Sequence, residues 1–192
     1  MVNPRIFDGI LTAEECNAII EVAAPKLAPS SMAGRRIGER IQTRARTSSE
    51  CWLASDEFPE GVQLRLLQIV ATTTGKPVEH IETLRVVRYK IGEFYRAHQD
   101  WFPQPQERFE EGGQRTHSAV LYLRKPEAGG ETYFPVLKLR VEPRAGRLLV
   151  WNNLDQDNNP SPEALHEATP PTAGTKWVLT TWVREHPFKR LD

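Results

Sequence analysis

The sequence has few cysteines, no surplus of charge of either sign and no long apolar run. Cys16 and Cys51 match neither a metal-ligand spacing nor a disulfide-rich framework, so both are expected to be small buried side chains. The 25 basic residues balance the 25 acidic ones, which argues against nucleic acid or an anionic membrane as a partner. No stretch is apolar for long enough to span a bilayer, and the start MVNPRIFDG lacks the features of a signal peptide. A cytoplasmic protein is therefore expected.

The length of 192 residues and the hydrophobic fraction of 39% fit a single domain with one core. Two helices are expected in its first part. Thr12 followed by Glu15 is a capping-box pattern, and the apolar run after it predicts a helix that ends near Pro25. Helical spacing of apolar residues over Pro59–Thr74, with Gly75 as a stop, predicts a second helix.

From Glu82 onward, short runs rich in Val, Leu, Thr and aromatic residues are separated by turns that contain Gly and Pro. The runs are ETLRVVRYK, THSAVLYLRK, ETYFP, LKLRV, GRLLVWNN and KWVLTTWVRE. This pattern favours an antiparallel sandwich or barrel, so the prediction is an α+β fold with a mainly β, jelly-roll core. Residues 1–80 are expected to supply helical support and a substrate loop, and residues 81–186 the jelly-roll core, within one domain spanning 1–192.

Two polar segments are expected to be loops. Arg35–Arg46 belongs to the stretch SSMAGRRIGERIQTRART, which holds five arginines. A solvated, mobile loop is the simpler interpretation of that stretch, and a substrate-facing lid is the alternative. Pro103–Gln114, within FPQPQERFEEGGQ, predicts a long surface loop that could form or close a groove.

The stretch YKIGEFYRAHQDWF contains His98 and Asp100, two positions apart. On an extended segment, side chains at i and i+2 point to the same face, so this imidazole and carboxylate can converge on one object. A metal ion is such an object, because two histidines and one carboxylate form the facial triad of non-haem iron(II) oxygenases. The His-x-Asp pattern alone is weak evidence. His166, far along the chain, offers the second imidazole.

Ten residues after His166, an alternating strand begins. One face of that strand carries Lys176, Val178, Thr180, Trp182 and Arg184, and the other carries Trp177, Leu179 and Val183. A cation, an indole and a guanidinium on one face are not typical of a closed apolar core. The first face is therefore expected to line a functional site.

Taken together, these motifs resemble the prolyl 4-hydroxylase branch of the iron(II)- and 2-oxoglutarate-dependent dioxygenases. The resemblance covers most of the chain and is carried by RTSSECWL, RYKIGEFYRAHQDWF, RTHSAVLYL, GGETYFP, VEPRAGRLLVWNN and LHEATPPTAGTKW with TTWVRE. It implies a double-stranded β-helix of jelly-roll type, with helices buttressing one side. It also implies hydroxylation of a C–H bond, coupled to decarboxylation of 2-oxoglutarate to succinate and CO2. The implied cofactors are Fe(II), 2-oxoglutarate and O2, with ascorbate as a candidate reductant.

The resemblance assigns three iron ligands, which are His98, Asp100 and His166. It makes Lys176 the partner of the distal carboxylate of 2-oxoglutarate, and Tyr89 and Thr132 hydroxyl donors to the same cosubstrate. A buried carboxylate needs a cation and hydrogen bonds to offset its desolvation. Asp100 points to hydroxylation, since related halogenating enzymes have a small residue in place of this carboxylate.

Five further positions match those at which peptide-hydroxylating members contact their substrate: Glu82, Tyr95, Arg115, Trp182 and Arg184. Tyr95 and Trp182 could hold a pyrrolidine ring by apolar contact, and Arg115 could hold a carbonyl or carboxylate. Each has a structural alternative, with Trp182 in the core, Arg115 in an ion pair and Glu82 on a solvated edge. Arg184 stands where relatives can have His, and this departure leaves the identity of the substrate open.

The function that the resemblance implies is hydroxylation of prolyl residues in a peptide or protein. One alternative is the same chemistry on a free amino acid or another small molecule. The other is a jelly-roll metal-binding module without catalysis. That module is disfavoured because it would have no need for Lys176 on the face that lines the ligand cavity.

Overall fold

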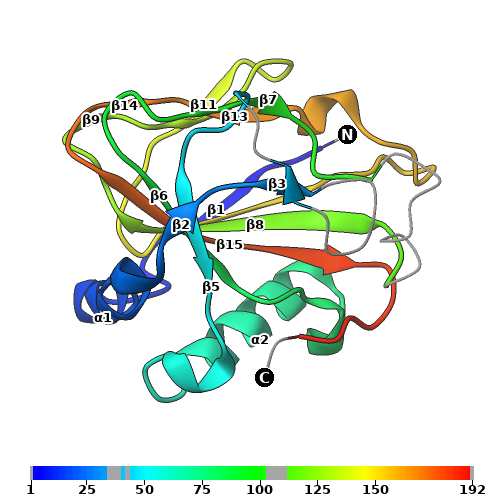
Figure 1. Ribbon diagram of the computed structural model, residues 1–192. Helices are drawn as coiled ribbons and strands as arrows, with labels where there is room; N and C mark the ends of the chain where they lie inside the picture. Colours follow the sequence, from blue (N-terminus) through cyan, green and yellow to red (C-terminus); the bar gives the residue numbers. More distant parts are fainter. Residues whose placement is uncertain (1, 34–39, 42–43, 103–111, 191–192) are drawn as a thin grey trace.

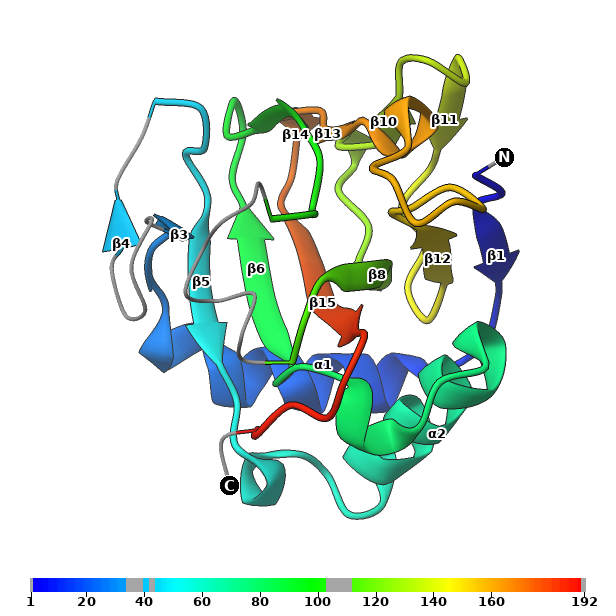
Figure 2. The ribbon, with the colours of Figure 1, turned by 90° about the vertical axis from the view of Figure 1, so that its right-hand side faces the viewer.

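The computed structural model describes residues 2–33, 40–41, 44–102 and 112–190. A large and a small antiparallel sheet lie against each other, and two helices cover the outer face of the large sheet (Figures 1 and 2). The strand order is β1-β12-β8-β15-β6-β5-β2 in the large sheet and β11-β10-β13-β7 in the small one. The mainly β jelly-roll fold predicted from the sequence is confirmed.

Six of these strands are the six runs predicted from the sequence: β6 (Arg85–Tyr89), β8 (Arg115–Arg124), β10 (Thr132–Phe134), β11 (Leu139–Val141), β12 (Leu148–Asn152) and β15 (Lys176–Arg184). The sheets are completed by β1 (Arg5–Phe7), β2 (Ala28–Pro29), β5 (Ser49–Trp52), β7 (Tyr95–His98) and β13 (His166–Ala168). Two short pairs join β9 (Ala128–Gly129) to β14 (Pro171–Ala173) and β3 (Met32–Ala33) to β4 (Arg40–Ile41). Residues 1–80 thus contribute strands to the large sheet as well as helices.

Helix α1 (Ala13–Ala23) begins with the predicted capping box. The Thr12 backbone N–H donates to the Glu15 carboxylate at 2.9 Å, and the Glu15 N–H donates to the Thr12 hydroxyl at 3.2 Å. Pro25 lies in the 3₁₀ turn η1 (Ala24–Lys26), so the helix ends where the sequence predicts.

Helix α2 (Val62–Thr74) starts later than predicted, because Gly61 at its N-cap has a φ of 73° and lies outside the helix. Gly75, with a φ of 68°, ends it as expected. Three further 3₁₀ turns are η2 (Ser55–Glu57), η3 (Val78–His80) and η4 (Pro162–Ala164).

The large sheet separates two apolar clusters. The outer cluster packs α1 and α2 against the sheet and includes Trp177, Leu179 and Val183 of β15. The inner cluster lies between the sheets and includes Val178 of β15, Tyr122 of β8 and Phe134 of β10. The alternation predicted for β15 is confirmed, and its inner face looks into the jelly roll.

The two predicted loops lie partly outside the described residues, because positions 34–39, 42–43 and 103–111 are not among them. Arg46, at the end of the first predicted loop, is 5% exposed and its guanidinium pairs with Glu50 at 2.9 Å. The expectation of a solvated loop is wrong at this end, because the ion pair holds Arg46 inside the protein. Gln114, at the end of the second, is also buried.

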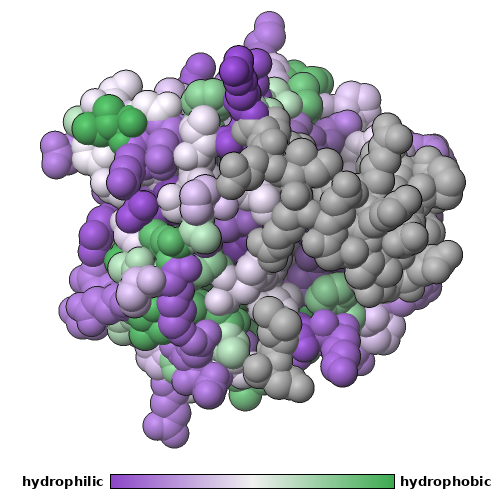
Figure 3. Space-filling view, viewed as in Figure 1, coloured by the Kyte–Doolittle hydropathy of each residue, from purple (hydrophilic) through white to green (hydrophobic). Residues whose placement is uncertain are grey.

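The surface mixes hydrophilic and hydrophobic residues, as Figure 3 shows for one face. The large hydrophobic side chains that are exposed, Ile6, Leu64, Ile91 and Val136, are far apart in the sequence of the described chain. Among the described residues, no helix has both the length and the apolar character that crossing a membrane requires. Cys16 and Cys51 are buried and free, as predicted.

Candidate metal centre and cosubstrate pocket

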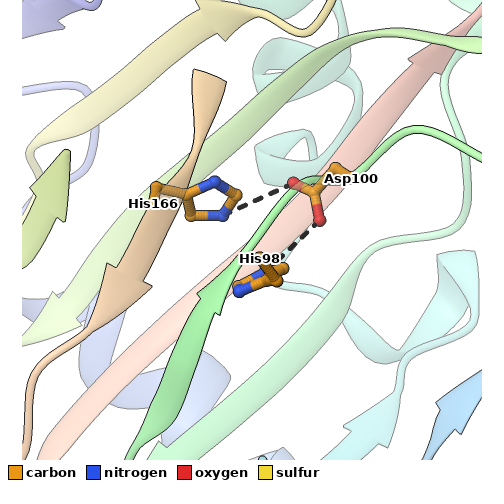
Figure 4. Close-up of side chains that lie close together, drawn as sticks. All are labelled: His98, Asp100 and His166. Carbon is orange, nitrogen blue, oxygen red and sulfur yellow. Dashed lines mark ion pairs between the residues drawn. The ribbon is translucent and has the colours of Figure 1, made fainter. Parts of the chain in front are cut away.

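Two neighbouring strands of the small sheet bring His98 and His166 together. The residues are register partners between β7 and β13, and their rings lie 4.2 Å apart between centroids. Strand β7 ends at His98, so Asp100 lies two residues beyond the strand. The sequence had instead predicted that both residues lie on one extended segment. The Asp100 carboxylate still turns back to both rings, at 3.5 Å from His98 Nε2 and 3.6 Å from His166 Nε2 (Figure 4).

These three side chains form a group that can hold a metal ion, since their ligand atoms all lie within 4.8 Å of one another. Both imidazoles are oriented by backbone carbonyls. His98 Nδ1 lies 2.9 Å from the Arg96 oxygen, and His166 Nδ1 lies 2.9 Å from the Ala164 oxygen. A carbonyl can only accept, so each Nδ1 donates its hydrogen and each Nε2 keeps a lone pair for a metal.

Aromatic rings hold the two imidazoles in place. Tyr95 stacks on His98 with 3.5 Å between ring centroids and an angle of 15°. Trp151 and Phe134, from the inner cluster, lie 4.6 Å and 5.8 Å from the His166 ring. Burial lowers the pKa of His166 to about 4, so this imidazole is neutral at neutral pH, which is the form that binds metals.

The Asp100 carboxylate is also held from outside its own segment. The Ser118 hydroxyl donates to Asp100 Oδ2 at 2.6 Å, and Ser118 is in turn bonded to Asn153. Burial alone would raise the pKa of Asp100, but the charge of His166 and His98 in their protonated forms outweighs burial and holds that pKa well below its usual range. The carboxylate is therefore ionised and ready to ligate a cation.

Lys176 is 1% exposed and lies on the inner face of β15. Its ammonium lies 5.3 Å and 5.6 Å from the ring centroids of Tyr89 and Tyr122. Within the described part of the chain, no carboxylate lies at ion-pair distance from it. Burial lowers the pKa of Lys176 to about 7, an effect that Glu131 partly opposes. A buried cation of this kind calls for an anionic partner.

The two residues predicted as hydroxyl donors, Tyr89 and Thr132, lie on strands next to this cation, and their contact with a cosubstrate stays a prediction. Thr132 Oγ1 accepts a hydrogen bond from the Tyr122 hydroxyl at 2.7 Å, and Tyr89 is the register partner of Lys176. Thr132 pairs with Ala168, two residues after His166, and the charge of Lys176 acts on the His166 ring, so the cation lies near the metal group. An anion with a metal-binding group at its other end, such as 2-oxoglutarate, fits this donor set.

Four of the five predicted substrate residues lie together in a largely buried cluster: Glu82, Arg115, Trp182 and Arg184. Arg115 donates from Nε and an Nη to the two Glu82 oxygens, each at 2.7 Å, and Arg184 Nη1 lies 3.5 Å from the same carboxylate. The Arg115 guanidinium covers the Trp182 ring at 3.7 Å, and Arg85 lies 4.5 Å from that ring. Tyr95 lies apart from them, on His98. Their part in substrate binding stays a prediction.

The residues of the site that were missed from the sequence include Ser118, Tyr122 and Asn153. Ser118 and Tyr122 stand on the same face of β8, four residues apart in the run THSAVLYL. That even spacing could have placed Tyr122 on the inner face, but nothing in the sequence says that this face meets Asp100 or Thr132.

A jelly roll with two histidines and one carboxylate at its centre defines a non-haem metal enzyme. Residues 84–184 match the family model described as the 2OG-Fe(II) oxygenase superfamily. The protein belongs to this superfamily, whose cofactors are Fe(II), 2-oxoglutarate and O2. It is a 2-oxoglutarate-dependent dioxygenase of the prolyl 4-hydroxylase type.

Curated relatives include probable prolyl 4-hydroxylase 10 of Arabidopsis thaliana, which is 32% identical over 96% of this chain and 69% of its own length. Prolyl 4-hydroxylase 13 of the same plant is also 32% identical, over 97% of this chain and 73% of its own. Among solved structures, the viral collagen prolyl hydroxylase of Paramecium Bursaria Chlorella virus-1, in its 2-oxoglutarate complex, superposes with a TM-score of 0.73. It is 25% identical, and the match covers 94% of this chain and 95% of that one.

Proposed function

We propose that the protein hydroxylates prolyl residues of a peptide or protein, using Fe(II), 2-oxoglutarate and O2. The observation that carries the proposal is the combination of the histidine and aspartate ligand atoms with a buried lysine that has no ion pair within the described residues. The relatives named as prolyl 4-hydroxylases support the choice of proline.

In this proposal His98, Asp100 and His166 hold the iron, and Lys176 holds the distal carboxylate of 2-oxoglutarate with hydroxyls nearby. The bound iron and its cosubstrates supply the oxidation, in which one oxygen atom of O2 enters succinate as CO2 is lost and the other enters the substrate C–H bond. With only three protein ligands, the iron would have room to bind its cosubstrates as well.

The chain itself positions and shields. The carbonyls of Arg96 and Ala164 keep a lone pair of each imidazole directed to the centre. Trp151 and Phe134 exclude water from the His166 side. Lys176 neutralises a carboxylate in a place where water cannot solvate it, which gives the cosubstrate one orientation.

For the substrate, we propose that Tyr95, half-buried beside His98, contacts the proline ring. Glu82, Arg115, Trp182 and Arg184 form one wall near the centre, and Arg115 contributes to the field at Asp100. The Glu82 carboxylate already accepts hydrogen bonds from Nε and Nη2 of Arg115. This wall therefore contributes to substrate binding through its shape and charge more than through a free guanidinium.

The test is to incubate the purified protein with Fe(II), ascorbate and 2-oxoglutarate and a panel of proline-containing peptides, with free proline and other free amino acids as the competing class. We expect peptide-stimulated succinate formation and a mass increase of one oxygen on a prolyl residue. The control is His166→Ala, which should form no succinate. Stimulation by free amino acids alone would assign the small-molecule function, and Fe(II) binding without any succinate would assign a non-catalytic module.

A further inference from the structure

The Asp100 carboxylate depends on a side-chain contact for its direction more than the two imidazoles do. His98 ends β7 and His166 begins β13, so hydrogen bonds of the small sheet hold both backbones. Asp100 comes two residues after the end of β7, in a segment without strand pairing. Among the described residues, the shortest contact of its side chain is the hydrogen bond from Ser118.

Ser118 is well placed to fix a neighbour. It lies in β8, and its register partners are Trp151 of β12 on one side and Trp182 of β15 on the other. It is 1% exposed, and its Oγ lies 2.6 Å from Asp100 Oδ2. A distance of this size is typical of a hydroxyl that donates to an ionised carboxylate, which is among the stronger hydrogen bonds in proteins.

Asn153 decides which way the Ser118 hydrogen points. A serine hydroxyl has one hydrogen to donate and two lone pairs that accept. The Asn153 amide lies at 3.0 Å (Nδ2) and 3.1 Å (Oδ1) from Ser118 Oγ, while Asp100 lies closer and is charged. The hydrogen therefore goes to Asp100, and Asn153 donates from Nδ2 to the Ser118 oxygen. This chain of donors runs from Asn153 through Ser118 to Asp100.

We propose that Ser118 is a positioning residue that orients the Asp100 carboxylate for the metal, with Asn153 directing its hydroxyl. The proposal rests on the proposed function only in taking Asp100 as a metal ligand. It gives the large sheet a share in the metal site, because the one ligand that lies outside the strands is held by a central strand of that sheet. The competing explanation is that Ser118 is merely a small residue that fits a tight interior position.

Mn(II) binding followed by electron paramagnetic resonance separates these explanations without any turnover. Ser118→Ala removes the hydroxyl and little volume. Partners of metal ligands typically change metal affinity by about 10- to 100-fold when they are removed, so we expect the Mn(II) dissociation constant to rise by at least about tenfold.

The matched control is Thr116→Val, which removes a hydroxyl two positions away on the same strand. The Thr116 hydroxyl contacts the Val183 carbonyl and the His117 ring and none of the three ligands. We expect its Mn(II) affinity to equal that of the parent. The melting temperatures of the metal-free variants report any general loss of structure.

Equal Mn(II) affinity in Ser118→Ala and the parent would overturn the proposal, as would an equal loss in Thr116→Val. If the alanine variant does not fold, Ser118→Cys takes its place, since it fills the position with a slightly larger atom and replaces the hydroxyl by a weak donor. The same rise in the dissociation constant is expected. A parent protein that binds no Mn(II) would instead refute the proposed function, so the two failures are distinguishable.

Discussion

Replacing Lys176 with alanine separates cosubstrate binding from metal binding. In a desolvated site, deleting one partner of a charge pair typically costs on the order of 3–5 kcal/mol. At about 1.4 kcal/mol per factor of ten, this weakens 2-oxoglutarate binding by roughly a hundredfold to a few thousandfold. At neutral pH we expect a loss near the hundredfold end of this range. With a Lys176 pKa of about 7, about half of the parent molecules must first protonate this residue before they bind 2-oxoglutarate.

The measurement is a titration of the anaerobic Fe(II) protein with 2-oxoglutarate, followed by the charge-transfer band of the complex. Fe(II) or Mn(II) affinity should stay close to that of the parent, because Lys176 is not one of the three residues that group to hold a metal. The 2-oxoglutarate affinity of Lys176→Arg should lie between those of Lys176→Ala and the parent. The arginine keeps the positive charge, but its planar guanidinium needs a pocket of another shape. If Lys176→Ala binds 2-oxoglutarate as tightly as the parent, another residue anchors the cosubstrate and the pocket is wrongly assigned.

Three further outcomes are expected. His166→Ala should abolish succinate formation and weaken Mn(II) binding while circular dichroism shows an intact fold, and unchanged turnover would remove the metal-site hypothesis. The affinity for 2-oxoglutarate should be constant below pH 7 and fall by up to tenfold per pH unit above it. The reason is that binding needs the charged form of Lys176 and raises the pKa of this residue above its value of about 7 in the free protein. Calorimetric titrations between pH 6 and 9 measure this affinity, and an affinity that does not change with pH would contradict the expectation. Glu82→Gln should lower the free energy of unfolding by about 3–5 kcal/mol, because Arg115 and Arg184 lose a buried carboxylate. Urea unfolding measures this, and a loss below 1 kcal/mol would show that the pair is well solvated.

The strands with strong alternation were predictable, and the short polar ones were not. Strands β6, β8 and β15 carry enough Val, Leu and aromatic residues for their period to show in the sequence. Strand β13 has only three residues, HEA, and β5 has four, SECW, so neither displays a period. What makes them strands is the neighbour that each one pairs with.

The site divides in a similar way. The grouping of His98, Asp100 and His166 was predictable because each belongs to a motif with a recognisable spacing, and the cosubstrate contact of Lys176 stays a prediction. The contact of Arg115 was not predictable, because the sequence does not reveal that its guanidinium donates to both oxygens of Glu82, 33 residues away. The role of Ser118 was hidden for the same reason, since its contact with Asp100 exists only after two sheets have packed together.

A bound metal would link the small sheet to the large one, through two of its strands and the hydrogen bond between Asp100 and Ser118. The small sheet has strands of only three or four residues, which are marginal alone, and two of them supply the imidazoles. Asp100 is tied to β8 of the large sheet through Ser118. Binding a metal therefore adds its free energy to the closed arrangement and disfavours local opening between the layers. Amide hydrogen exchange in β7 and β13 is expected to slow when Mn(II) is added, while exchange in α1 and α2 stays the same.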